Sequence, residues 1–146
     1  MEKRIEIQEI EPQAFEAMYA VEKYIQKSGL KKSHHELIKI RASQINGCAF
    51  CINMHTVDAI KAGETAKRIF LLNAWRETTL FTEEEQAILA MTEEITHISQ
   101  HGLTDESYAK AEKLFNPNYI AQIIMAIVAI NSWNRISVAT KRIVGE

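Results

Sequence analysis

Apolar residues recur three or four positions apart along most of the chain, and helix-capping residues separate these runs. Pro12 can begin a helix, because it needs no N–H partner there, and the apolar positions from Phe15 to Ile25 follow at helical spacing. Gly29 supplies a stop after them. The pattern therefore predicts a first helix over residues 12–29.

The same signals predict six more helices. Two of them begin with a capping-box pattern, Ser33 with Glu36 and Thr82 with Glu85, and another begins at Asn116 followed by Pro117. The expected helices are 33–46 with Gly47 as the cap, 48–63, 65–76, 82 to about 102, 104–115 and 116 to about 141. We predict a single all-α domain of about six or seven helices over residues 1–146.

The N-terminal segment RIEIQEI alternates polar and apolar residues with period two. Such alternation is typical of a strand, but the chain offers no second strand to pair with it. We expect residues 1–11 to form an arm beside the helical domain.

Composition excludes several classes of protein. The chain has 47% apolar and 25% charged residues and a net charge of −2, so nothing in the charge favours nucleic acid or an anionic membrane. Its longest apolar run, 120–130, contains Gln122 and is well short of the roughly 20 residues that span a bilayer. The N-terminus has no basic segment followed by an apolar one, so we expect no export and a cytoplasmic location.

The two cysteines of the chain lie in the segment NGCAFCINMH, spaced Cys-x-x-Cys. If a helix begins at Cys48, then Cys51 and His55 lie on the same face, and the two Cα atoms are about 5–6 Å apart, within disulfide range. Unpaired backbone N–H groups at the helix start would stabilise a Cys48 thiolate. This pattern favours a redox dithiol, with inert buried thiols and a structural staple as weaker interpretations.

Glu36 precedes this motif on the expected previous helix. The simplest interpretation is that it caps that helix together with Ser33, and the functional one is that it accepts a proton near the dithiol. A third interpretation is a zinc site made by Cys48, Cys51, His55 and Glu36, although zinc-binding cysteines usually lie on a turn rather than at a helix start.

The segment ELIKIRASQINGCAFCINMH resembles the signature of the AhpD-like alkylhydroperoxidases in the carboxymuconolactone decarboxylase superfamily. The continuation AGETAKRIFLLNAWRETTLFTEEEQAILAMTEEIT and the later INSWNRI are similar to segments of that family. The resemblance covers about residues 12–140 and implies an all-α fold that reduces peroxides through a disulfide, without metal or prosthetic group.

The resemblance also implies roles for individual residues. Cys51 would attack the peroxide, Cys48 would resolve the sulfenic acid, and Glu36 and His55 would relay protons. A dithiol reductant of lipoyl or thioredoxin-like kind would restore the thiols. The chain departs from the family at Phe50, because well-characterised members have a histidine immediately before the second cysteine. A non-catalytic redox sensor or small-ligand-binding protein is therefore the alternative.

Several other polar residues allow simpler interpretations. His34 and His35 belong to the first turn of an expected helix and should be exposed. Trp133 is expected to pack in the core, with Asn131 or Trp133 lining a pocket over the dithiol as the alternative. Arg135 is expected to pair with a carboxylate at a helix or subunit interface. The apolar last helix leaves more hydrophobic surface than so small a domain can bury, which predicts a homo-oligomer, whether dimer, trimer or hexamer.

Overall fold

A computed structural model describes residues 2–145, and within them every regular element is a helix. The predicted all-α class is therefore confirmed. The elements are α1 (Ile7–Ile10), α2 (Pro12–Lys27), α3 (Lys32–Ile45), α4 (Ala49–Lys61), α5 (Ala66–Phe70), the 3₁₀ helix η1 (Leu72–Glu77), α6 (Glu83–Thr96), α7 (Ile98–His101), α8 (Asp105–Leu114) and α9 (Pro117–Ala139). None of these helices is both long and apolar enough to cross a membrane.

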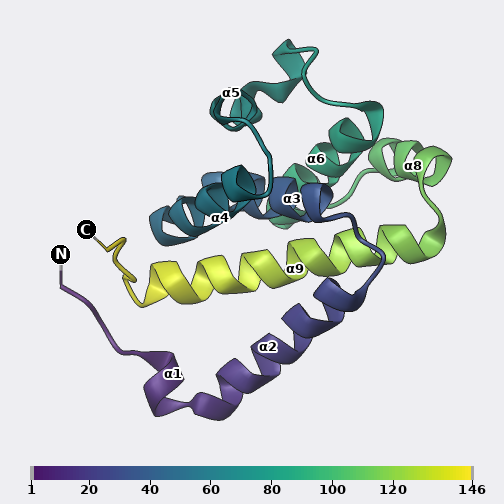
Figure 1. Cartoon of the computed structure of the whole chain (residues 1–146). Helices are drawn as coiled ribbons and strands as arrows, with labels where there is room; N and C mark the ends of the chain where they lie inside the picture. Colours follow the sequence, from purple (N-terminus) through teal and green to yellow (C-terminus); the bar gives the residue numbers. More distant parts are fainter. Residues whose placement is uncertain (1, 146) are drawn as a thin grey trace.

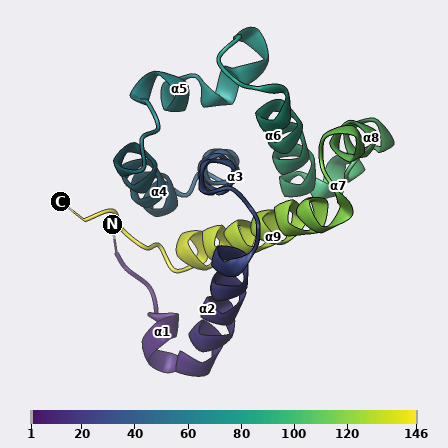
Figure 2. The ribbon, with the colours of Figure 1, turned by 45° about the vertical axis from the view of Figure 1, so that its right-hand side comes forward.

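Helix α3 lies at the centre of the molecule, with α4, α5, α6 and α9 around it (Figure 2). Its two apolar sides enter two different cores. One side contributes Ile38 to a core shared with α6 and α9, and the other contributes Leu37 and Ile40 to a core with Leu72 and Trp75. Because both sides of α3 are buried, the loop that follows it, and the cysteine motif after the loop, start from a rigid support.

Helix α2 diverges from the rest of the body and contacts α9 (Figure 1). The contact is made by Phe15, whose ring lies edge-on to Trp133 at 5.4 Å, and by Glu22, which accepts a hydrogen bond from the Trp133 indole at 3.0 Å. The segment before α2 forms no strand within the described residues; it runs back beside the end of α9, where Arg4 donates to the Ala139 carbonyl at 2.9 Å.

The ends of α3 and α9, like the end of α4 at Gly63, share one backbone motif that orients the residue after it. At the end of α3, Gly47 has φ +63° while the Cys48 N–H donates to the Ser43 carbonyl at 3.0 Å. At the end of α9, Lys141 has φ +52° while the Arg142 N–H donates to the Ser137 carbonyl at 2.9 Å. Both are Schellman turns, which favour glycine at the left-handed position.

Tertiary contacts shift one predicted helix start. The capping box of Thr82 and Glu85 is confirmed, but the one expected for Ser33 and Glu36 is wrong, because α3 begins at Lys32 and no side chain caps it. The first turn is held instead by Tyr119 of α9, whose hydroxyl contacts the Lys31 N–H at 3.1 Å and His34 Nδ1 at 2.7 Å.

Two expected helices are broken. The helix expected over 65–76 divides at Leu71, which allows Leu72 and Trp75 on η1 to enter the second core. The helix that opens at Thr82 ends at Thr96, not near residue 102. Glu93 near its end links three elements, because it accepts hydrogen bonds from Trp75 of η1 at 2.8 Å, Arg41 of α3 at 3.0 Å, and Arg76.

Candidate active site

The two cysteines form a disulfide at the start of α4, with their Cα atoms 5.3 Å apart. Cys48 is the N-cap residue, and its sulfur accepts a hydrogen bond from the Cys51 N–H at 3.3 Å. Both residues are only 2% exposed. The helix start expected from the spacing is therefore present, and one of its terminal N–H groups, that of Cys51, is satisfied by the Cys48 sulfur.

A cavity of about 350 Å³ opens beside the disulfide, and Cys51 lines it whereas Cys48 does not. The lining comes from α2, α3, α4, α9 and the segment after α9, and much of it is apolar. Its apolar side chains are Phe15, Tyr19, Phe50, Met54, Ile130 and Trp133. The geometry thus gives the two cysteines different surroundings, because Cys51 belongs to the cavity wall and Cys48 does not.

His55 lies one turn beyond Cys51 and lines the same cavity. Burial and, to a smaller extent, the charge of Lys39 lower the pKa of its imidazole to about 4, against an opposing effect of Asp58. Its Nδ1 atom is buried and has no hydrogen-bond partner within residues 2–145. The side chain is therefore a neutral imidazole at neutral pH with an unused nitrogen.

Glu36 lies outside the cavity wall, although it is only 5% exposed. Its Oε1 accepts a hydrogen bond from Lys39 at 3.1 Å, and Lys39 itself lines the cavity with His55. Its Oε2 is buried without a partner among the described residues, like His55 Nδ1. Most buried polar atoms are hydrogen-bonded, so these two atoms are exceptions that need an explanation. Sequence reasoning missed Lys39, which connects the carboxylate to the cavity.

The structure does not assemble the four residues into a metal centre. Cys48 and Cys51 are bonded to each other, and Glu36 is engaged by Lys39. In the described part of the chain, no three His, Cys, Asp or Glu side chains are arranged to hold a metal ion.

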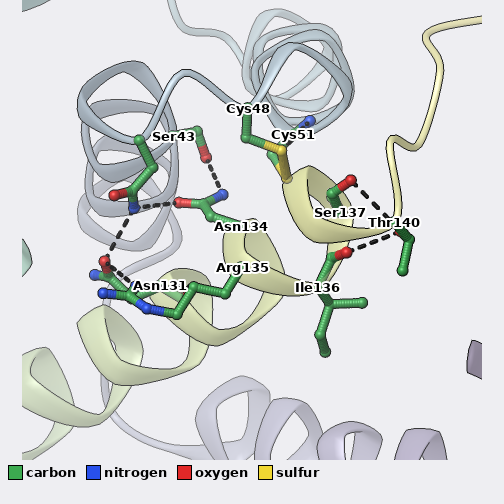
Figure 3. Close-up of a disulfide and its surroundings, with 10 residues drawn as sticks. Ser43, Cys48, Cys51, Asn131, Asn134, Arg135, Ile136, Ser137 and Thr140 are labelled. Carbon is green, nitrogen blue, oxygen red and sulfur yellow. Dashed lines mark hydrogen bonds between the residues drawn. A yellow bond between two sulfur atoms is a disulfide. The ribbon is translucent and has the colours of Figure 1, made fainter. Parts of the chain in front are cut away.

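A buried network of amide side chains holds the loop before Cys48 against α9 (Figure 3). Asn46 donates to Asn131 at 3.0 Å and to Asn134 at 2.9 Å, and Asn134 donates to the Ser43 hydroxyl at 3.0 Å. Asn134 is 1% exposed. The sequence did contain a signal for this network, because two asparagines in an apolar helix require polar partners when buried.

The remaining sequence expectations have mixed outcomes. Trp133 lines the cavity, whereas Asn131 does not. Among residues 2–145 Arg135 pairs with no carboxylate; it donates to the carbonyl and side chain of Asn131, and a carboxylate across a subunit interface stays a prediction. The expected exposure of the two histidines is wrong: His34 is 4% exposed, and burial, with the charges of Lys39 and His55, lowers the pKa of His35 to about 3.

Phe50 is held by a cation from the other end of the chain. The guanidinium of Arg142 lies 4.5 Å from the centroid of the Phe50 ring, and both residues line the cavity. The position that carries a relay histidine in the resembled peroxidases is thus part of an aromatic–cation pair here.

An all-helical domain with a Cys-x-x-Cys disulfide at a helix start defines the class of AhpD-like proteins. Residues 12–94 match the carboxymuconolactone decarboxylase family, and the chain belongs to that family. The resemblance inferred from the sequence is therefore confirmed. The family includes both peroxidases of the AhpD type and decarboxylases.

Individual relatives support this assignment. The chain is 44% identical over 139 residues to the uncharacterized protein YdfG of Bacillus subtilis, covering 95% of each chain. It is similar to a crystal structure of a protein of unknown function from Agrobacterium tumefaciens, assigned provisionally to AhpD antioxidant defence, with 39% identity, a TM-score of 0.96 and 99% of each chain covered. An uncharacterized peroxidase-related protein with an AhpD core from Ralstonia eutropha shares the fold alone, with a TM-score of 0.82 at 15% identity over 95% of this chain and 74% of that one.

Proposed function

We propose that this protein is a thiol-dependent peroxidase that reduces organic or hydrogen peroxide through the Cys48–Cys51 dithiol. The observation that carries the proposal is the position of the disulfide. It lies at the start of α4, and Cys51 and His55 both line one cavity. The apolar lining of that cavity favours an organic hydroperoxide as the substrate.

In the proposed reaction, the thiolate of Cys51 attacks the terminal oxygen of the hydroperoxide. A sulfur–oxygen bond forms, the oxygen–oxygen bond breaks, and the alkoxide takes a proton and leaves as the alcohol. The thiolate of Cys48 then attacks the sulfur of the Cys51 sulfenic acid, the disulfide forms as the sulfur–oxygen bond breaks, and the hydroxide takes a proton and leaves as water. A dithiol reductant, of lipoyl or thioredoxin-like kind, returns two electrons by thiol–disulfide exchange.

The surroundings of the two sulfurs support this division of roles. Cys51 is the cysteine that a reactant in the cavity can reach. Cys48 is the N-cap residue and does not line the cavity, and there the hydrogen bond from the Cys51 N–H favours the thiolate form. A stabilised thiolate suits the resolving step, which takes place inside the protein and needs no access from the cavity.

Glu36 and His55 are the proposed proton relay. The neutral imidazole of His55 can accept the thiol proton at a ring nitrogen and return it to the leaving alkoxide, and the free Glu36 Oε2 is the second acceptor. Lys39 contacts Glu36 and also lines the cavity, so it is the route by which a change at the carboxylate reaches His55.

Single-cysteine variants test the roles directly. Cys48→Ser should still form a sulfenic acid at residue 51 with cumene hydroperoxide, which dimedone traps and mass spectrometry detects, whereas Cys51→Ser should form none. Asn53→Ser, a substitution at an exposed position of α4, is the matched control and should behave as wild type. A sulfenic acid formed faster at residue 48 than at residue 51 would reverse the assignment.

The alternative is a redox sensor or small-ligand-binding protein that uses the same dithiol. Phe50 favours it, because an apolar ring beside the sulfurs suits ligand packing and cannot relay a proton. A steady-state assay with thioredoxin or dihydrolipoamide separates the two: repeated turnover supports the peroxidase, and a single stoichiometric oxidation supports the sensor.

Self-association is part of the proposal. Ile98 of α7 and Val128 of α9 are 57% and 45% exposed, and they border an apolar groove that also includes Ile95, Leu103 and Ile124. A second copy of the chain is the partner we propose for this surface, since isolated soluble chains seldom expose a large contiguous apolar patch. Light scattering should give a multiple of the chain mass, and Val128→Glu should lower it.

A further inference from the structure

Arg142 places a positive charge at the dithiol end of the cavity. Its side chain lines the cavity, and its guanidinium stacks on Phe50, the residue immediately before Cys51. The N-terminus of α4, with its unpaired N–H groups, lies at the same end. A cationic side chain and a helix N-terminus therefore lie at the end of the cavity where Phe50 and Cys51 line the wall.

The backbone fixes this position of Arg142. The Schellman turn at the end of α9 holds the Arg142 N–H on the Ser137 carbonyl at 2.9 Å, and Ser137 also lines the cavity. The N-terminal arm secures the turn from outside, because the Arg4 N–H donates to the Thr140 carbonyl at 3.2 Å. The guanidinium is thus presented to the cavity by a tied segment rather than by a free tail.

The other charges on the cavity wall are engaged or lie farther along it. Lys39 is paired with Glu36 at 3.1 Å, and Glu22 accepts the hydrogen bond of the Trp133 indole. Asp58 lies about two turns beyond Cys51 on α4. Among the charges that line the cavity, Arg142 is therefore the one that stacks on Phe50, the residue before Cys51.

Arg142 has no salt bridge to a carboxylate within residues 2–145. Glu6 is within electrostatic range, since the hydrogen bond of Lys3 and, to a smaller extent, the charges of Lys3 and Arg142 lower the pKa of Glu6. Lys3 already pairs with that carboxylate at 2.8 Å. The planar guanidinium thus retains donors for a carboxylate, a geometry that suits arginine better than lysine.

We propose that Arg142 makes the dithiol end of the cavity a subsite for an anionic group, so that reactants bearing a carboxylate are favoured over neutral ones. On the proposed function, the preferred substrate is then an organic hydroperoxide that carries a carboxylate. The apolar lining holds the hydrocarbon part, and the guanidinium holds the acid.

Alkylation of the reduced protein tests the subsite without any need for peroxidase turnover. Iodoacetate and iodoacetamide react by the same step, in which the thiolate displaces iodide, but only iodoacetate is charged. In the ratio of the iodoacetate rate constant to the iodoacetamide rate constant at Cys51 the thiolate fraction cancels, so this ratio reports the preference for an anion. Arg142→Gln should lower this ratio about threefold or more, a size expected for one partly exposed charge. Arg142→Lys keeps the charge but loses the planar fork, so its ratio should lie between those of Arg142→Gln and wild type.

Lys141→Gln is the matched control, because Lys141 is the adjacent exposed cation and does not line the cavity. An equal ratio in wild type and Arg142→Gln, or an equal fall in Lys141→Gln, would overturn the subsite. The preference among peroxides is measured as kcat/KM for a carboxylate-bearing hydroperoxide divided by kcat/KM for cumene hydroperoxide. Arg142→Gln should lower this ratio. If wild type turns over neither peroxide, the proposed function fails while the alkylation ratio still decides on the subsite.

Discussion

Replacing Asn134 by alanine should destabilise the protein far more than an average polar substitution. Asn134 is 1% exposed and makes two hydrogen bonds across helices, one to Ser43 and one from Asn46. A hydrogen bond contributes about 1 kcal/mol net, and a buried polar group left unpaired costs about 1–3 kcal/mol. Ser43 is fully buried and would lose this partner, whereas Asn46 keeps Asn131.

The expected loss in the free energy of unfolding is therefore about 2–4 kcal/mol. For a domain of this size that lowers Tm by roughly 5–15 °C. Urea unfolding at a fixed protein concentration measures the free energy, and calorimetry measures Tm. Ser132→Ala is the control: its hydroxyl makes only a local bond to the Val128 carbonyl on the same helix, so its effect should stay within about 0.5 kcal/mol.

A double-mutant cycle with Ser43→Ala isolates the hydrogen bond itself. The two substitutions should be less than additive by about 0.5–1.5 kcal/mol, because either one removes the same contact. The Cys48 N–H, which bonds to the Ser43 carbonyl, should also exchange its hydrogen faster in Asn134→Ala. A loss below about 1 kcal/mol, or strict additivity with Ser43→Ala, would refute this account of the network.

Three further predictions concern helix ends and buried ionisable groups. Gly47 and Lys141 both have positive φ, so Gly47→Ala should lower the unfolding free energy by about 1 kcal/mol or more and Lys141→Gly should raise it by about 0.4–1 kcal/mol. Urea unfolding measures both, and a rise for Gly47→Ala or a fall for Lys141→Gly contradicts this prediction. Burial raises the pKa of Glu93, but hydrogen bonds from two arginines and a tryptophan lower it more, so its stabilising effect is present above pH 4.5 and lost as the pH falls. Glu93→Gln should thus be less stable than wild type at pH 7, by about 1–3 kcal/mol, with a smaller difference at pH 3.5, as measured in urea. Burial lowers the pKa values of His35 and His55 to about 3 and 4, so between pH 6.5 and 4 these side chains bind more protons in the unfolded chain than in the folded one. Their contribution to stability therefore falls as the pH drops through that window. An NMR titration that gives either ring a pKa near 6.5 would contradict this.

The sequence predicted helices well where local chemistry decides them. The capping box at Thr82 and the glycine after α3 act within a few residues of the helix end that they set. It failed at Ser33, because Tyr119, far along the chain, holds the first turn of α3. It also missed the break at Leu71, which depends on how η1 meets the second core.

The same division applies to the candidate site. The spacing of Cys48, Cys51 and His55 within one helix predicts that they lie together, and they do. The cavity wall combines segments from both ends of the chain, so Lys39 and Arg142 could not be placed beside the dithiol before the helices were packed. Glu36 is intermediate: its burial follows from the fold, and its link to the cavity requires Lys39.

The most direct test of the central claim is a thiol count on the reduced protein before and after peroxide. The chain contains two cysteines, so two free thiols are expected at the start. One equivalent of cumene hydroperoxide should remove both thiols, yield cumyl alcohol, and leave an intramolecular disulfide that thioredoxin or dihydrolipoamide reopens for further turnover. If both thiols survive excess peroxide, the protein is not a dithiol peroxidase.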